Sequence, residues 1–214
     1  MHAILFNEPI ENNFIGHIMA EVYRDRVYAP FLEGKKDLTI LDIGANIGIT
    51  SYYFSQFAKD VYSVEPSLEH FDILTRMLEF NHIKNVHPIN KAVYMKEGQL
   101  PLFNNPNKTM KSLHQAVSDG TPPEMVDCIT LQGLMDQNKI EKVDFMKIDT
   151  EGSEVEILSN TAFRSVSPRI KTIVGEYHDW SGRHENQIKD ALESAGYTFS
   201  WIPNQAHLFL AERK

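Results

Sequence analysis

The stretch LTILDIGANIGIT, residues 38–50, decides the fold of this chain. Its first six residues are mostly apolar and contain no turn-forming residue, which predicts a central strand of a parallel sheet covered on both faces. Gly44 and Gly48 follow. Because neither has a Cβ atom, the backbone there can turn tightly and approach a ligand closely. The stretch therefore predicts a buried strand, a glycine turn and the start of a helix.

The rest of the chain alternates between expected strands and helices. Helical or strand patterns occur at residues 12–33 (helix), 47–58 (helix), 60–66 (strand), 67–80 (helix), 86–90 (strand), 143–149 (strand), 170–178 (strand) and 185–195 (helix), and residues 126–131 pair locally with 99–103. Two apolar segments separated by Pro203, Asn204 and Gln205 predict a terminal hairpin with one antiparallel strand at an edge. Alternation of this kind predicts an α/β protein of three layers, with a doubly wound, mostly parallel sheet. We expect residues 1–214 to form a single domain, with residues 1–37 as a helical lead-in packed on it.

Polar side chains stand at the carboxyl ends of the expected strands. They are Asp42, Glu65, Asn90, Asp149, and Glu176 with His178. In open α/β sheets, ligands bind in the crevice beyond these strand ends. A single crevice bordered by these side chains is therefore the expected site.

The glycine turn lacks the marks of a dinucleotide or phosphate loop. Positions 46 and 49 are Asn and Ile, so the second and third glycines of G-x-G-x-x-G are absent, and no G-K-[ST] occurs. Glu65 lies at the end of the second strand, which is the usual place for a carboxylate that binds both ribose hydroxyls. A nucleoside without a pyrophosphate, carrying an amino-acid tail, fits both features.

Three segments, DIGANIGITSYYF, VYSVEPSLEHF and VDFMKIDTEGSEVEIL, resemble the FkbM-type methyltransferases, class I enzymes that use S-adenosylmethionine. The resemblance runs from about Val22 to Tyr197. It implies a Rossmann-like fold with seven strands and methyl transfer to an oxygen of a sugar or natural product. It also implies that Asp42, Gly44, Asn46 and Gly48 hold the methionine part of the cofactor, Glu65 the ribose, and that Asn90 and Ala92 border the adenine.

An alcohol acceptor needs a proton acceptor, and the strand ends offer candidates. Asp149 ends the fourth main strand, next to the first, and is the first choice. His178 is the second, because its ordinary pKa near 6.5 lets it take a proton at neutral pH, and Glu176 lies two residues before it. Glu154 is interpreted only as a favourable charge at a helix start. Lys147 shares a strand face with Asp149 and is expected either to pair with a carboxylate of the crevice or to extend its charged end to the edge of the crevice.

No compact metal-binding motif such as H-E-x-x-H occurs, so the sequence alone predicts no metal. The alternative is that Asp149, Glu176 and His178 bind a divalent cation that polarises a hydroxyl. Residues 104–115, with Asn104, Asn107, Lys108 and His114, are the expected acceptor-facing loop.

Composition limits the partners of the chain. The net charge of −8 argues against an extended nucleic-acid surface, and no apolar stretch is long enough to span a membrane. The N-terminus shows no signal peptide, and the single cysteine, Cys128, fits the reducing cytoplasm. We therefore expect a cytoplasmic enzyme with a small hydroxylated acceptor. The same fold acting on an RNA or protein nitrogen, a nicotinamide oxidoreductase and a non-catalytic cofactor-binding module remain as alternatives.

Overall fold

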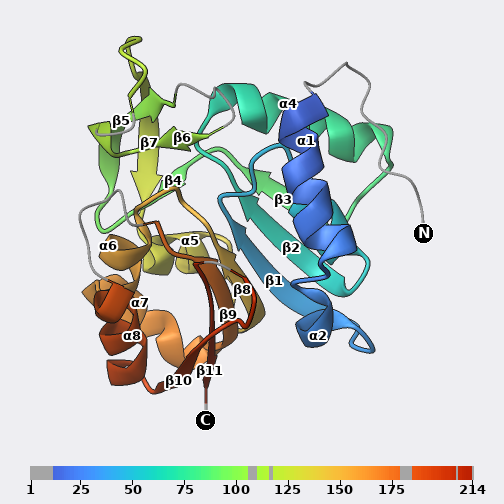
Figure 1. Cartoon of the computed structure of the whole chain (residues 1–214), viewed down its shortest axis with the longest axis vertical. Helices are drawn as coiled ribbons and strands as arrows, with labels where there is room; N and C mark the ends of the chain where they lie inside the picture. Colours follow the sequence, from blue (N-terminus) through green and yellow to red (C-terminus); the bar gives the residue numbers. More distant parts are fainter. Residues whose placement is uncertain (1–11, 106–109, 116–117, 179–184, 206, 214) are drawn as a thin grey trace.

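The computed structural model describes residues 12–105, 110–115, 118–178, 185–205 and 207–213. Its main sheet has seven strands (Figure 1). In spatial order they are β10 (Tyr197–Trp201), β11 (Leu208–Arg213), β9 (Ile170–Glu176), β8 (Val143–Ile148), β1 (Leu38–Ile43), β2 (Ala58–Val64) and β3 (Val86–Ile89). Neighbouring strands from β9 to β3 are parallel, whereas β11 is antiparallel to both β9 and β10. The predicted mostly parallel sheet is confirmed.

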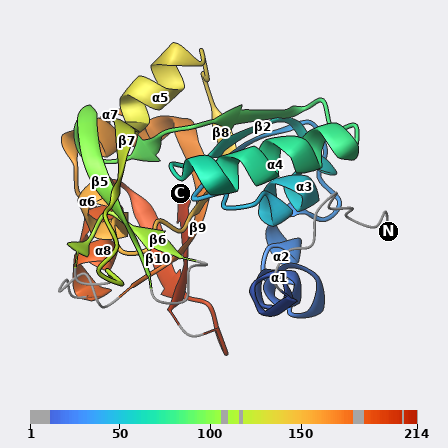
Figure 2. The same cartoon turned by 90° about the horizontal axis from the view of Figure 1, so that it is seen from above.

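Helices cover both faces of this sheet (Figure 2). The first group comprises α1 (Asn12–Met19), a π-helical turn (Ala20–Arg24), α2 (Ala29–Leu32), α3 (Ile49–Ser55) and α4 (Leu68–Phe80). The second group comprises α5 (Leu131–Gln137), α6 (Glu154–Leu158), α7 (Thr161–Val166), a 3₁₀ turn (Ser167–Arg169) and α8 (Glu185–Ser194). Successive side chains of a strand point to opposite faces. Accordingly Ile40 belongs to the core under the first group, whereas Leu41 and Ile43 belong to the core under the second. This alternation explains why β1 reads as an apolar run.

The terminal hairpin is present, but its antiparallel strand is not at the edge. Strand β11 lies between β9 and β10, and β10 forms the edge. The burial of the two strands explains the order. Leu208, Phe209 and Ala211 of β11 are buried, while most of β10 is partly or fully exposed. The more apolar strand therefore takes the inner position.

Two expected helices differ from the prediction in their boundaries. The lead-in is broken into α1, the π-helical turn and α2, and Val22, Val27, Tyr28 and Leu32 join the core beneath them. Helix α3 ends at Ser55, and Ala58, expected on its apolar face, instead begins β2. The sequence pattern missed this end because Phe57 and Ala58 continue the apolar spacing of the helix past Ser55 and Gln56.

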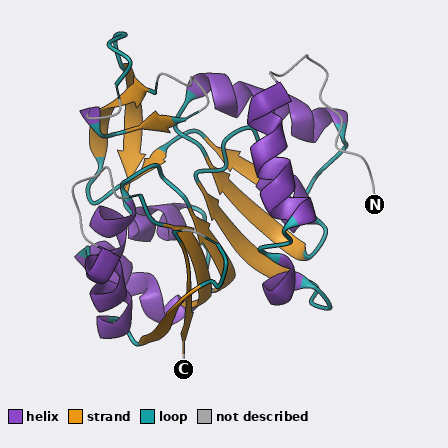
Figure 3. Ribbon diagram, viewed as in Figure 1, coloured by secondary structure: helices purple, strands orange, loops and turns teal. Residues whose placement is uncertain are grey.

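A second, smaller sheet lies beside the main one (Figure 3). Its strands, in order, are β4 (Ala92–Val93), β7 (Glu124–Ile129), β5 (Gly98–Asn104) and β6 (Lys111–Ser112). The predicted local pairing of β7 with β5 is confirmed. Residues 92–93, expected just past the third strand, pair with β7 instead. This sheet brings β6 over the strand ends of the main sheet, where the site lies.

Candidate active site

The glycine turn holds two parts of the protein in close contact. Gly44 has φ +78°, and a Cβ atom there would lie 1.7 Å from the carbonyl oxygen of Asp149. Gly48 has φ +90°, and its Cβ would lie 2.6 Å from Cε of Met77 on α4. Gly44 therefore lets the ends of β1 and β8 approach, and Gly48 lets α4 pack against the turn.

Asp42 supports this turn from below. Its carboxylate is fully buried, and Oδ2 accepts hydrogen bonds from Oγ1 of Thr50 (2.7 Å) and Oγ of Ser51 (2.6 Å). Nζ of Lys147 lies 3.6 Å from the other oxygen. Asp42 therefore fixes the start of α3 and does not line the cavity above it.

Glu65 follows β2 and lies at the mouth of the glycine turn. Its Oε2 accepts a hydrogen bond from the backbone N–H of Asn46 (2.8 Å), and its Oε1 accepts one from the N–H of Ser67 (2.9 Å). Burial raises the pKa of this carboxyl group to about 7, although these bonds and the charge of Lys147 oppose the shift. The side chain is thus held at a fixed position with its carboxylate at the cavity.

A cavity lies beyond the strand ends. Of the predicted site residues, it is lined by Gly44, Asn46, Glu65, Ala92 and Asp149. Further lining residues are Lys91, Met110, Lys111, Leu113, Thr150, Glu151 and Ser153. The predicted residues Asp42, Gly48, Asn90, Glu176 and His178 are not among the residues that line it.

The side chain of Asn90 stabilises the loop that carries Glu65. Its amide donates hydrogen bonds to the carbonyl oxygens of Glu65 (2.9 Å) and Pro66 (3.0 Å). Within the loop predicted to face the acceptor, Asn104 instead bonds Thr121, while Asn107 and Lys108 lie outside the described residues. It is β6 and its neighbours that reach the cavity.

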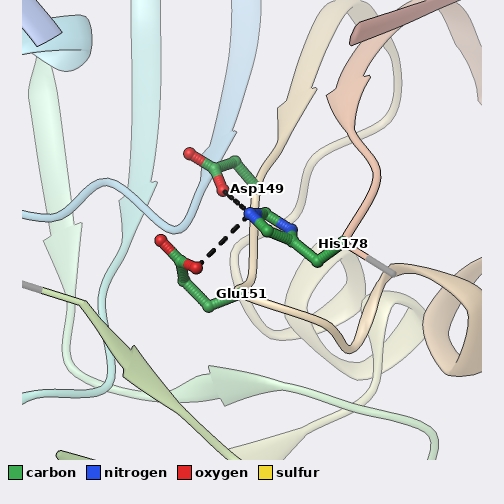
Figure 4. A group of neighbouring side chains, drawn as sticks. All are labelled: Asp149, Glu151 and His178. Carbon is green, nitrogen blue, oxygen red and sulfur yellow. Dashed lines mark ion pairs between the residues drawn. The ribbon is translucent and has the colours of Figure 1, made fainter. Parts of the chain in front are cut away.

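A histidine and several carboxylates meet at the ends of β8 and β9 (Figure 4). Nε2 of His178 lies 3.3 Å from Oε2 of Glu151, 3.8 Å from Oε1 of Glu176 and 3.9 Å from Oδ1 of Asp149. Strand β9 ends at Glu176, so His178 reaches this group from the segment after the strand. The three predicted catalytic residues are thus neighbours, and Glu151 joins them.

Glu154 has a different place from the one expected. It is 1% exposed, and its Oε1 accepts hydrogen bonds from the N–H groups of Thr150 (2.8 Å) and Gly152 (3.2 Å). The same oxygen lies 3.2 Å from Nδ1 of His178. Its interpretation as only a helix-start charge is wrong, because it also orients the histidine. In the sequence, the two glutamates of TEGSE, residues 150–154, were the only sign of this role.

Electrostatics in this group change the expected role of His178. Burial lowers its pKa, but the hydrogen bond and charge of Glu154, with the charges of Asp149 and Glu151, outweigh burial and raise the pKa to about 10. Burial and the charge of Asp149 raise the pKa of Glu151 and of Glu176. His178 therefore carries a proton at neutral pH, and the carboxylates are the better proton acceptors.

Lys147 joins the two ends of the site. Its Nζ donates a hydrogen bond to the carbonyl oxygen of Gly44 (2.9 Å) and lies 3.2 Å from Oδ2 of Asp149. Burial lowers its pKa, but Asp149 and Asp42 raise it by more. The expected pairing of this buried lysine with a carboxylate is confirmed.

Comparison with known proteins identifies the family. Residues 42–199 match the model of the methyltransferase FkbM domain. The chain belongs to the FkbM methyltransferase family. It is 24% identical to the methyltransferase sdnD of Sordaria araneosa, over 92% of this chain and 89% of that protein.

Solved structures of methyltransferases share the fold of this FkbM chain. SMU.1697c, a putative methyltransferase from Streptococcus mutans in complex with S-adenosylhomocysteine, has a TM-score of 0.54 at 15% identity, covering 98% of this chain and all of that one. TrmK of M. capricolum, also with S-adenosylhomocysteine, has a TM-score of 0.54 at 13% identity over 90% of this chain and 68% of that one. At these identities, the likeness shows the fold alone.

The residues of this FkbM chain fit the cofactor that the family uses, S-adenosylmethionine. A buried carboxylate, Glu65, faces the cavity where ribose hydroxyls need an acceptor, and Gly44 keeps the neighbouring wall free of side-chain atoms. The predicted cofactor is confirmed by the family.

Among the described residues, no helix is long and apolar enough to cross a membrane.

Proposed function

We propose that this chain transfers a methyl group to a hydroxyl oxygen of a small acceptor. The observation that carries the proposal is that one cavity is lined by residues that follow three adjacent strands. Asn46 follows β1 and Glu65 follows β2, and we call their part of the cavity the cofactor end. Asp149 and Glu151 follow β8, and we call their part the acceptor end. When bound, S-adenosylmethionine supplies a methyl group already activated on a sulfonium.

At the cofactor end, the chain contributes mainly shape and fixed hydrogen-bonding groups. Glu65 offers its carboxylate to the ribose hydroxyls. Ala92 and Leu113 add apolar walls for the adenine, and Met110 and Lys111, at the start of β6, line the same cavity. Nζ of Lys111 lies 3.1 Å from Oε2 of Glu69 on α4, which ties β6 to the main fold. Such positioning can contribute roughly 7–11 kcal/mol to a displacement reaction.

At the acceptor end, a carboxylate takes the proton of the hydroxyl. The O–H bond breaks, the oxygen bonds the methyl carbon, and the sulfur keeps the electron pair of the broken S–C bond. Asp149 is the first choice, because it lines the cavity and its Oδ1 has no hydrogen-bond donor in the described part of the chain. The protonated imidazole of His178, with Nε2 3.9 Å from Oδ1 of Asp149, stabilises the charge of the carboxylates.

The acceptor class rests on the charges around the cavity. Carboxylates at the acceptor end repel phosphates, and the net charge of −8 disfavours long nucleic-acid contacts. Hydroxyl groups, in contrast, donate hydrogen bonds to carboxylates. A polyhydroxylated small molecule, such as a sugar or a natural product, is therefore the proposed substrate.

Two measurements test this function. S-Adenosylhomocysteine should raise the melting temperature of the full chain, as any ligand of the native state does. A screen of hydroxylated sugars and metabolites, followed by release of S-adenosylhomocysteine, should then identify an acceptor. No stabilisation by S-adenosylhomocysteine contradicts cofactor binding, and turnover only with amines or RNA contradicts the hydroxyl acceptor.

A further inference from the structure

The imidazole of His178 is oriented with one nitrogen toward the acceptor end. Its Nδ1 lies 3.2 Å from Oε1 of Glu154, which is itself held by backbone N–H groups. His178 is 4% exposed, and its Nε2 faces Asp149 and Glu151 (Figure 4). Glu176 is the third carboxylate beside Nε2. A buried carboxylate on one imidazole nitrogen is the usual support for a metal bound to the other.

The facing atoms have the spacing of a metal-binding set. One ligand atom each from Asp149, Glu151 and His178 lies within 4.8 Å of the others. Adjacent ligands at about 2.1 Å from an octahedral cation are about 3 Å apart. Nε2 of His178 is 3.3 Å from Oε2 of Glu151 and 3.9 Å from Oδ1 of Asp149, which is close to that spacing.

Negative charge exceeds positive charge around these atoms. Carboxylates come from Asp42, Asp149, Glu151, Glu154 and Glu176, whereas the described cations among them are Lys147 and His178. Nζ of Lys147 pairs with Oδ2 of Asp149, whereas Nε2 of His178 is nearer the other oxygen, Oδ1. A divalent cation at Nε2 takes the place of the proton that His178 otherwise carries there, and so adds positive charge among these carboxylates.

Ser153 gives an independent sign of a ligand. It is 1% exposed and lines the same cavity as Asp149 and Glu151. Although it precedes α6, its hydroxyl does not cap that helix, and the described residues offer it no hydrogen-bond partner. Buried hydroxyls are normally bonded, so this one points to a bound group such as the water shell of a cation.

We propose that Asp149, Glu151 and His178 bind a divalent metal ion that also holds the acceptor hydroxyl. The donor set of two carboxylates and one imidazole suits Mn²⁺, and Mg²⁺ and Zn²⁺ are the natural comparisons. The sequence alone predicts no metal because these ligands are spread over two strand ends. Folding brings them together, and Glu151, absent from the sequence-based alternative, completes the set.

The inference rests on the proposed function and refines its chemistry. Bound to the cation, the acceptor oxygen loses its proton more readily. With Asp149 and Glu151 occupied as ligands, the proton passes to Glu176, whose side chain is 34% exposed and 3.8 Å from Nε2. The oxygen then forms its bond to the methyl carbon as before.

Metal binding can be measured without an acceptor or cofactor. The full chain is treated with EDTA, dialysed and titrated with MnCl₂, and bound Mn²⁺ is followed by electron paramagnetic resonance. We expect one Mn²⁺ per chain, with a nitrogen coupling from His178. Glu151→Gln and His178→Asn should abolish this binding, and Glu154→Gln should weaken it by about 10- to 100-fold. Glu79→Gln, on the exposed face of α4, is the control and should bind normally.

The outcomes separate the two proposals. Wild-type protein that binds no Mn²⁺, binds it without a nitrogen coupling, or binds it as weakly as Glu151→Gln overturns the metal site. Circular dichroism of each variant verifies folding, and the wild-type result decides if a variant does not fold. If S-adenosylhomocysteine stabilises the protein but Mn²⁺ does not bind, the metal site is wrong and the proposed methyltransferase function still stands. Mn²⁺ binding without S-adenosylhomocysteine binding contradicts the proposed function instead.

Discussion

The cofactor end and the acceptor end of the cavity are built by different means. At the cofactor end, backbone groups dominate, since Gly44 clears space and the N–H groups of Asn46 and Ser67 hold Glu65. At the acceptor end, side-chain charges dominate, since His178 lies among carboxylates from two strand ends and α6. Backbone geometry gives one end a fixed shape, and charge gives the other a reactive group. Substitutions should therefore affect the two ends separately, except at their junction.

The largest effect is expected at that junction. Gly44→Ala should destabilise the fold by at least about 3 kcal/mol, because the new Cβ overlaps the Asp149 carbonyl oxygen. Gly34→Ala is the matched control, with φ +77° but no atom within 4 Å, and should cost about 1–2 kcal/mol. Urea unfolding measures both. Equal losses would mean that backbone conformation, and not contact between the two ends, limits position 44.

Next in size is the loss of turnover in Asp149→Asn. The change removes a cavity-lining carboxylate and should lower kcat by about 10²- to 10⁴-fold. Binding of S-adenosylhomocysteine, measured by calorimetry, should stay nearly the same because Glu65 is untouched. If turnover persists with a genuine acceptor, the acceptor end does not depend on this carboxylate.

Glu65→Gln should show the opposite pattern. Loss of a charged acceptor for the ribose hydroxyls costs about 1.5–3 kcal/mol, which corresponds to a roughly 10- to 150-fold weaker affinity for S-adenosylhomocysteine. Mn²⁺ binding at the acceptor end should remain. Glu79→Gln, on the exposed side of α4, controls for a general loss of negative charge. An unchanged affinity in Glu65→Gln would remove this residue from the cofactor end.

The smallest effect is a pH dependence at the cofactor end. Burial raises the pKa of Glu65 to about 7, so the carboxylate form gains population as the pH rises from 6 to 8. Affinity for S-adenosylhomocysteine should rise a few-fold over this range, since only the carboxylate accepts two hydroxyl donors. A flat profile in the wild-type protein, or the same rise in Glu65→Gln, would assign the dependence elsewhere.

The same raised pKa predicts an opposite trend for stability. The native state holds the proton of Glu65 more tightly than the unfolded chain, whose value is near 4.5. This contribution to stability is therefore complete below pH 4.5 and is lost as the pH rises through about 7. Comparing urea unfolding of wild type and Glu65→Gln at pH 5 and pH 8 isolates it.

The sequence was most informative where function depends on local spacing. The apolar run of β1, the glycine turn and the acid at the end of β2 are close in the chain, so their relation could be predicted. Asp42 shows the limit of that reasoning. It stands at a strand end, but its side chain points beneath the turn to Thr50 and Ser51, and only the folded sheet fixes that direction.

The acceptor end was harder to predict because its geometry arises from packing. Asp149, Glu176 and His178 could be grouped from strand order alone. The burial of Glu154 and the approach of Glu151 to His178 could not, since the turn after β8 places Glu151 at φ +55° and Ser112 of β6 donates a hydrogen bond to its carbonyl oxygen. From the sequence alone, an acidic residue near a helix start is predicted to be exposed to solvent. Only the fold shows that a neighbouring strand end covers it.

The position of β11 has a consequence for how the protein is made. Residues 208–213 form the strand that joins β10 to β9, and Leu208 pairs with Glu176 beside the acceptor end. Until the ribosome has released this segment, the nascent chain keeps an open edge on β9, and such edges pair with other chains. A chain cut short before residue 208 would keep that edge. Strand β11 therefore protects the edge of β9 from pairing with other chains.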